Sequence, residues 1–301
     1  MEGGLLIIGN GFDLDLGLHT RYSEFWDSDR WKEIKKTCPE RYLITSLERY
    51  RITNHWFDLE SGLQDGAAKL LKKLNESYDN NHYYKSFQIL KSELKSYIKN
   101  QQETFVPKAN SVAEQMLHAI DSNNSLKSIY TFNYTDIIDI SKRFHISELP
   151  PVNYIHGSLY PNDDIILGIE VEDFSSIPSQ LTFLIKSNNP YYHSSNLLDD
   201  MEISDNIIFF GHSINGMDFP YFKDFFARLV SLPQKLHKKN VTIITYDMES
   251  EMQIKDNLRR NGIDVRSLFN KVALDFILTK EVYNENEVEL RKLENLKGMM
   301  R

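Results

Sequence analysis

A run of four aliphatic residues, Leu5–Ile8, leads without a break into Gly9, Asn10 and Gly11. A short apolar run closed by a turn signal is typical of a strand buried on both faces of a parallel sheet. Glycine lets the backbone turn sharply and approach a neighbour with no side chain in between. The feature therefore predicts a buried first strand that opens into a tight strand-to-helix turn.

Similar apolar runs recur further along the chain, and helical stretches separate several of them. The predicted strands are residues 5–8, 128–132, 152–155, 206–210 and 241–245, and the clearest helices among them are residues 218–230 and 248–261. Strands that alternate with helices indicate a mostly parallel sheet with helices on both faces. We therefore expect a Rossmann-like α/β fold.

The region between the first two predicted strands has a different pattern. Apolar residues there recur at helical spacing, as in the stripe Phe87, Leu90, Leu94, Tyr97 and Ile98. Strand signals are scarce, which predicts an all-helical lobe inserted into the α/β domain. The expected boundaries are 1–21 and 126–280 for the Rossmann-like domain, 22–125 for the lobe, 170–200 for a loop or lid, and 281–301 for a C-terminal surface helix.

Composition narrows the classes of function. Lys and Arg number 35 against 43 Asp and Glu, a net charge of −8, which disfavours a general nucleic-acid binder. The local basic patch Lys235–Lys239 is interpreted as a solvated face.

The only cysteine, Cys38, cannot form an internal disulfide, which fits a reducing cytoplasm. No apolar run approaches the roughly 20 residues of a membrane helix, and no metal-binding motif occurs, so we expect neither membrane nor metal.

Polar residues follow several predicted strands at their carboxyl ends, the edge where open parallel sheets bind ligands. Asn133 follows residues 128–132, His156 follows residues 152–155, and Gly211 begins the turn after residues 206–210. An imidazole titrates near neutral pH and suits proton transfer from a hydroxyl or water. The alternatives are structural: a helix cap or turn for the asparagine, and a core histidine bonded to backbone.

The Gly9 turn has two interpretations. Backbone amides at such a turn and at the start of the next helix favour phosphate. The third glycine of the dinucleotide-binding fingerprint is missing, however, so a plain strand-to-helix turn is the alternative.

Taken in order, these motifs resemble a known family. Gly-Asn-Gly-Phe-Asp at 9–13, Phe-Asn-Tyr-Thr at 132–135, Ile-His-Gly-Ser at 155–158 and Gly-His-Ser at 211–213 look like the AbiH phage abortive-infection family. More broadly, their order is similar to the sirtuin-type NAD-binding domain. The lobe adds one further match, Trp56-x-Asp58-x-Glu60.

The resemblance implies roles for particular residues. Gly9 and Gly11 would line the NAD pyrophosphate, Asn133 would orient the nicotinamide ribose and the attacking water, and His156 would be the catalytic base. The full predicted binding set is Gly9, Asn10, Gly11, Phe12, Asp13, Gly211, Ser213 and Asp247, with Asp58, Glu60 and Asp218 as further pocket residues. The acidic pair Asp58 and Glu60 also fits an exposed first helical turn.

Two departures from sirtuins shape the expected activity. Asp13 stands where sirtuins carry serine, and the four zinc cysteines of sirtuins are absent, which disfavours protein deacylation. The leading hypothesis is an NAD hydrolase that makes nicotinamide and ADP-ribose in antiphage defence. The alternatives are a sensor that binds NAD or ADP-ribose without cleavage and, third, a nuclease. Expected partners are NAD, further copies of the chain, and a phage-derived trigger or partner defence protein.

Overall fold

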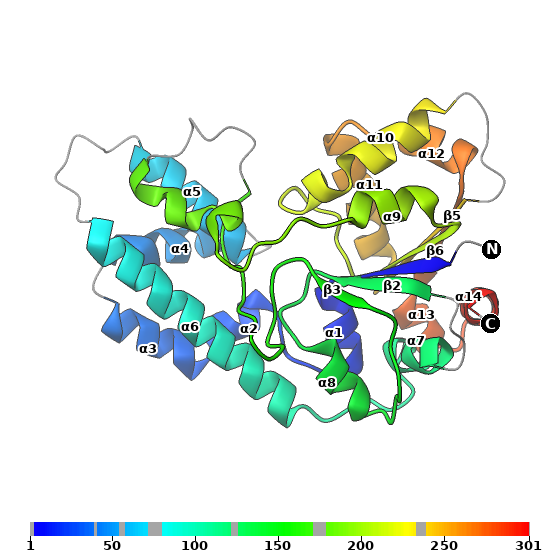
Figure 1. The fold of residues 1–301 in the computed structure, drawn as a ribbon, viewed down its shortest axis with the longest axis horizontal. Coiled ribbons are helices and arrows are strands. Elements are labelled where there is room, and N and C mark those ends of the chain that lie inside the picture. The colour runs from blue at the N-terminus through cyan, green and yellow to red at the C-terminus, as the bar shows by residue number, and fades with distance from the viewer. Residues whose placement is uncertain are drawn as a thin grey trace. The chain divides into compact units, whose positions relative to one another are not determined.

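A computed structural model describes residues 3–38, 41–53, 58–71, 80–121, 126–170, 179–232 and 239–300. It contains a six-stranded, all-parallel sheet in the order β3-β2-β1-β4-β5-β6, of which β2, β3, β5 and β6 are labelled in Figure 1. The strands are β1 Gly4–Ile8, β2 Leu126–Thr131, β3 Val152–Tyr154, β4 Asn206–Phe210, β5 Asn240–Thr245 and β6 Ala273–Leu278. The predicted Rossmann-like α/β class and its five strands are confirmed. The sixth strand, β6, was not predicted.

Helices cover both faces of this sheet because successive side chains of a strand point to opposite faces. On β1, Leu6 and Ile8 belong to one apolar cluster, whereas Leu5 and Ile7 belong to the other. The first cluster takes in α1 Asn10–Leu16, α7 Val112–Asp121, α8 Ile137–Lys142 and α14 Glu287–Met299. The second takes in α9 Leu197–Ile203, η4 Phe219–Tyr221, α10 Lys223–Ser231, α11 Met248–Arg260 and α12 Val265–Lys271. β1 is thus fully buried, as its aliphatic run predicts.

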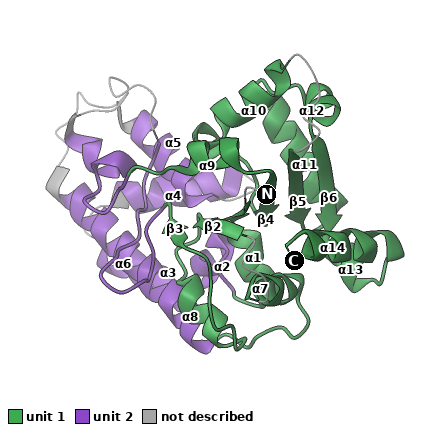
Figure 2. Cartoon of the chain, turned by 45° about the vertical axis from the view of Figure 1, so that its right-hand side comes forward, with its two compact units in different colours: residues 1–18, 105–155, 194–301 green, residues 19–104, 156–193 purple. Residues whose placement is uncertain are grey.

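The chain divides into two compact units (Figure 2). Unit 1 comprises residues 1–18, 105–155 and 194–301 and contains the sheet; unit 2 comprises residues 19–104 and 156–193. This division differs from the boundaries expected from the sequence: residues 19–21 fall in unit 2, and two longer segments also change sides. Residues 105–121 group with unit 1, because α7 packs its apolar face on α1, and residues 156–193 join the helical unit.

In its described residues, unit 2 is built from helices and short 3₁₀ turns, with one isolated parallel β-bridge between Ile169 and Ile185. These are α2 Tyr22–Asp27, α3 Asp29–Thr37, α4 Arg41–Thr53, α5 Leu59–Leu71, α6 Asn80–Thr104, η2 Ser179–Leu184 and η3 Lys186–Asn188. The stripe predicted for α6 is buried from Phe87 to Ile98. The indole rings of Trp26 and Trp31 stack at 3.6 Å between centroids, which anchors the pair α2 and α3.

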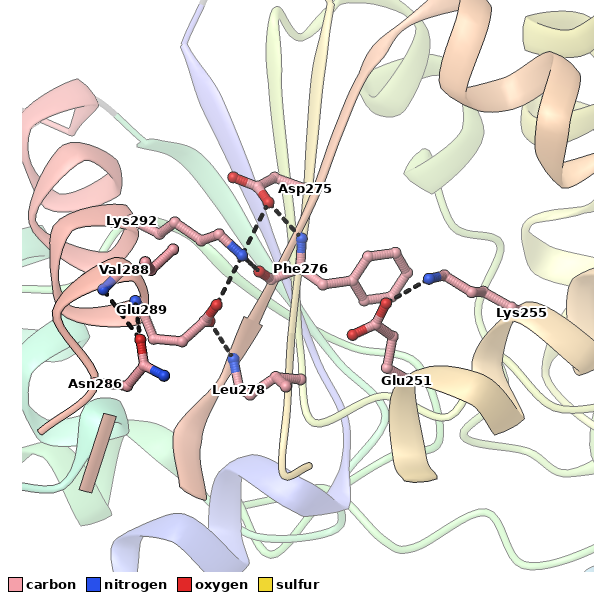
Figure 3. A network of polar contacts seen from close by, with 9 residues as sticks. All are labelled: Glu251, Lys255, Asp275, Phe276, Leu278, Asn286, Val288, Glu289 and Lys292. Carbon is pink, nitrogen blue, oxygen red and sulfur yellow. Dashed lines mark hydrogen bonds and ion pairs between the residues drawn. The ribbon is translucent and has the colours of Figure 1, made fainter. Parts of the chain in front are cut away.

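The C-terminal helix α14 closes the exposed edge of β6 (Figure 3). Asn286 caps the helix by accepting from the amides of its first turn. Glu289 accepts a hydrogen bond from the amide of Leu278 at 2.9 Å, and the ammonium of Lys292 donates to the carbonyl of Phe276 at 2.9 Å. Backbone groups on a free sheet edge are a template for unwanted strand pairing. The C-terminal segment therefore does more than lie on the surface, because its side chains satisfy that edge.

Candidate functional site

The glycine turns after β1 and β4 are packed directly against each other. A Cβ atom at Gly9 would lie 2.6 Å from the Cα of His212, and one at Gly11 would lie 2.6 Å from the Cα of Gly211. Gly211 itself has a φ of +64°, and a Cβ there would lie 2.3 Å from the amide nitrogen of Phe12. Glycine is required at these positions because any side chain would force the two loops apart.

This packing uses the amides of the turn. The amide of Gly9 donates to the carbonyl of Phe210, that of Gly11 to Gly211, and that of Phe12 to Gly9, each at 2.9 Å. Phe12 is buried and meets the ring of Phe210 edge-on, and Asn10 is exposed at the start of α1. The predicted contact of this turn with pyrophosphate stays a prediction, and donors other than these three amides would have to make it.

Asn133 follows β2 and is held by two acceptors that face its amide nitrogen. Nδ2 donates to the carbonyl of Gly9 at 3.1 Å and to Oδ1 of Asp13 at 2.9 Å. Because a backbone carbonyl can only accept, these contacts place the nitrogen on the Gly9 side and leave Oδ1 as the atom suited to bind a hydroxyl or a water. Sequence reasoning selected both Asn133 and Asp13, and the structure brings them together.

Asp13 is a buried carboxyl whose pKa is raised. Burial raises its pKa to about 7, although hydrogen bonds from Thr135 and Asn133 favour the ionised form. The hydroxyl of Thr135 lies 2.9 Å from Oδ2 of Asp13 and so completes the cluster of Asp13, Asn133 and Thr135. Sequence reasoning missed Thr135, whose one signal was its place in the quoted Phe-Asn-Tyr-Thr motif. The cluster can store or release one proton near neutral pH.

The loop after β4 holds a buried histidine, His212. Its Nδ1 accepts the amide of Ile214 at 3.0 Å, and its Nε2 lies 3.6 Å from a carboxylate oxygen of Asp218. Ile214 has a φ of +48°, a conformation that is strained for a β-branched residue. His212 was not among the predicted site residues, although it stands between Gly211 and Ser213, which were.

Two other predicted residues have structural contacts. Asp247 caps α11 by accepting from the amide of Ser250 at 3.1 Å, and these hydrogen bonds lower its pKa. The carbonyl of Ser213 accepts from the side chain of Asn257 at 3.0 Å. Both residues lie at carboxyl ends of strands, where their predicted contacts with the nucleotide stay predictions.

Unit 2 contains the predicted residue His156 in a buried polar cluster. The ammonium of Lys186 lies 2.8 Å from Oε2 of Glu60 and 3.3 Å from Nε2 of His156. His156 and Glu60 are buried, and Lys186 is wholly inaccessible to solvent. Sequence reasoning selected His156 and Glu60, but no pattern pointed to Lys186, which lies in a segment without clear periodicity.

The acidic motif in the lobe separates into two roles. Asp58 caps α5 by accepting the amides of Glu60 and Ser61 at 3.1 and 3.3 Å, which matches the structural alternative of a helix start. Glu60 instead points its carboxylate at Lys186. Trp56, the first residue of the motif, lies outside the described residues, as does most of the basic patch Lys235–Lys239.

Unit 1 thus has the strand order of the dinucleotide-binding α/β folds, with β1 and β4 at the point where the order reverses. Residues 5–244 match the family model for bacteriophage abortive infection AbiH. Because the match spans most of the chain, the protein belongs to the AbiH family, and that family implies a role in abortive-infection defence against phage. A search of curated proteins gives no match.

No helix among the described residues combines the length and the apolarity needed to cross a membrane. Nor do these residues include a group of three or more His, Cys, Asp or Glu side chains placed to hold a metal ion.

Proposed function

We propose that this protein serves in phage defence by hydrolysing NAD to nicotinamide and ADP-ribose. The observation that carries the proposal is the placement of Asn133 beside the β1 turn, in a sheet whose order reverses between β1 and β4. Ligands of open α/β sheets bind outside the carboxyl ends of the strands at such a reversal. The resemblance of the motifs to the sirtuin-type NAD-binding domain supports NAD as the dinucleotide.

The proposed reaction breaks the bond between the nicotinamide nitrogen and C1′ of the ribose. The bonding electron pair leaves with nicotinamide, which becomes neutral, and the ribose passes through an oxocarbenium-like state. A water then adds to C1′ and loses one proton to the surrounding solvent. Asn133 cannot take that proton, so its role is to orient the water or a ribose hydroxyl through Oδ1. Loss of cellular NAD would stop growth of the infected cell.

The test measures nicotinamide released from NAD by purified protein, and NAD content in cells after phage infection. Asn133→Ala is expected to lower turnover about 100-fold through lost positioning. Asn153→Ala is the matched control, because Asn153 is an exposed asparagine on β3 and is expected to leave turnover unchanged. If wild-type protein neither releases nicotinamide in vitro nor lowers NAD after infection, the proposal is wrong.

A second function, binding NAD or ADP-ribose without cleavage, is favoured by one contact. Nε2 of His156 faces the ammonium of Lys186 at 3.3 Å, and an imidazole nitrogen occupied in that way does not accept a proton from water. The same assay separates the two functions. A sensor would bind NAD, measured by calorimetry, and release no nicotinamide either as pure protein or in infected cells.

A further inference from the structure

The cluster of Glu60, Lys186 and His156 joins three segments that lie far apart in the sequence. Glu60 belongs to the first turn of α5, His156 follows β3, and Lys186 begins η3. The ammonium of Lys186 lies between the carboxylate of Glu60 and the ring of His156, at 2.8 and 3.3 Å. A lysine without solvent access needs such partners, because a buried charge is costly unless paired and hydrogen-bonded.

The backbone holds Lys186 and His156 through one loop. The amide of Lys186 donates to the carbonyl of Ile169 at 3.1 Å, and the carbonyl of His156 accepts the amide of Ile166 at 2.7 Å. Close approach within this loop requires glycine: a Cβ at Gly168 would lie 2.3 Å from the carbonyl oxygen of Leu184. These contacts tie the backbones of His156 and Lys186 to the same loop, and their side chains meet at 3.3 Å.

The chemistry of the two groups then decides where the proton of the ring resides. An ammonium group has three donors and no acceptor, and one donor of Lys186 points at the carboxylate of Glu60 at 2.8 Å. A neutral imidazole has one donor nitrogen and one acceptor nitrogen. We infer that Lys186, held by Glu60, fixes His156 as a neutral ring with Nε2 as the acceptor and the proton on Nδ1.

This inference deepens the proposed function and rests on it for its catalytic consequence. A ring with its proton on Nδ1 acts towards substrate as a hydrogen-bond donor, whereas the sequence resemblance assigns His156 the role of a base. Its partner would be an oxygen of the substrate, such as a ribose hydroxyl. Lys186 and Glu60 are then positioning residues, since they act on substrate only through His156.

Nitrogen NMR of the free protein tests the tautomer without NAD. Protein labelled with ¹⁵N only in histidine gives long-range proton–nitrogen spectra whose cross-peak pattern distinguishes the two neutral tautomers. The chain has nine histidines, and His156→Gln identifies the signal that disappears. We expect the Nδ1–H pattern for His156 at neutral pH. An Nε2–H pattern, or a doubly protonated ring, would overturn the inference.

Variants then test whether Lys186 is the cause. Lys186→Met alone leaves Glu60 buried and unpaired, so the double variant Glu60→Gln/Lys186→Met removes both charges together. The expected result is loss of the pure Nδ1–H pattern, in favour of Nε2–H or a mixture. Lys91→Met is the matched control: Lys91 pairs with Asp164 in the same unit at 2.7 Å, and the His156 pattern should be unchanged there. A Nδ1–H pattern that persists in the double variant would remove Lys186 from its assigned role.

The rate of NAD cleavage tests whether His156 acts as a donor. An asparagine places an amide donor where Nδ1 lies, whereas a glutamine places its amide near Nε2. His156→Asn is expected to stay within about tenfold of wild type, and His156→Gln to lose about 100-fold or more. Equal losses in both would refute the donor role. If the wild-type protein does not cleave NAD, the proposed function is wrong, whereas the tautomer of His156 is still decided by the NMR result.

Discussion

Replacing Asp13 by asparagine should change how the stability of the protein depends on pH. Asp13 is buried beneath the β1 turn and accepts from Asn133 and Thr135, each at 2.9 Å. Asparagine has the same shape and can make both contacts, since its oxygen accepts from Asn133 and its nitrogen donates to the hydroxyl of Thr135. The substitution therefore removes the ionisation and little else.

The size and sign of the effect follow from two pKa values. Burial raises the pKa of Asp13 from 3.8 to about 7 in the folded protein. Well below pH 4 both the folded and the unfolded state hold the proton, and Asp13 then adds no pH dependence to the free energy of unfolding. Between pH 4 and 7 the unfolded chain releases the proton while the folded protein keeps it, so stability falls as pH rises. Three pH units at about 1.4 kcal/mol each correspond to a loss of about 4 kcal/mol, complete above pH 7.

Urea unfolding of wild type and Asp13→Asn at several pH values from 4 to 8 measures this loss. Circular dichroism at 222 nm follows both units, whereas the three tryptophans all fall within residues 19–104 and so follow unit 2. Several other carboxyls have lowered pKa values and give slopes of the opposite sign, but these cancel in the difference between the two proteins. They are Asp121, Asp164, Asp200, Asp247 and Asp264.

The expected result is a stability difference, wild type minus variant, that falls by about 4 kcal/mol between pH 4 and 8. Asp29→Asn is the control at a fully exposed aspartate, where the hydrogen bond from Lys32 lowers the pKa and the slope has the opposite sign. Parallel pH profiles for wild type and Asp13→Asn would show that Asp13 ionises like a free carboxyl, and would refute the reasoning.

Three further predictions concern the packing of the two glycine turns, the buried ion pair of Lys186 and Glu60, and the cap of α14. Gly11→Ala should lower stability by about 1–3 kcal/mol, because its Cβ would lie 2.6 Å from the Cα of Gly211; an unchanged melting temperature would show that the two loops separate freely. Lys186→Met should destabilise by about 3–5 kcal/mol in urea unfolding, and the addition of Glu60→Gln should recover part of that loss, whereas strictly additive losses would contradict a coupled pair. Asn286→Ala should remove the cap of α14 and lower stability by about 1 kcal/mol, and faster hydrogen exchange confined to α14 and β6 should accompany it; protection equal to wild type would argue against this capping role.

Local patterns in the sequence were sufficient for most of the sheet. Leu5–Ile8 is buried on both faces, and only a strand between two helical layers demands four consecutive aliphatic side chains of that kind. β6 escaped prediction because it is an edge strand: Ala273 and Asp275 are exposed, so its apolar run is broken. The C-terminal helix was predicted, but its contacts with β6 depend on the position of that strand at the edge of the sheet.

In the candidate site, too, the residues that could be predicted are those with a local sequence pattern, whereas contacts between distant segments could not be predicted. Motif order identified Asn133, His156 and Glu60, because each stands beside a strand end or a helix start that can be recognised over a few residues. The contact of Lys186 with His156 and Glu60, across 30 and 126 residues, has no local signature. Periodicity records which face of one segment is buried, and it carries no record of which distant segment covers that face. The glycines at 9 and 11 were likewise predictable as a turn, but only the path of the chain after β4 determined that another backbone occupies the space they leave.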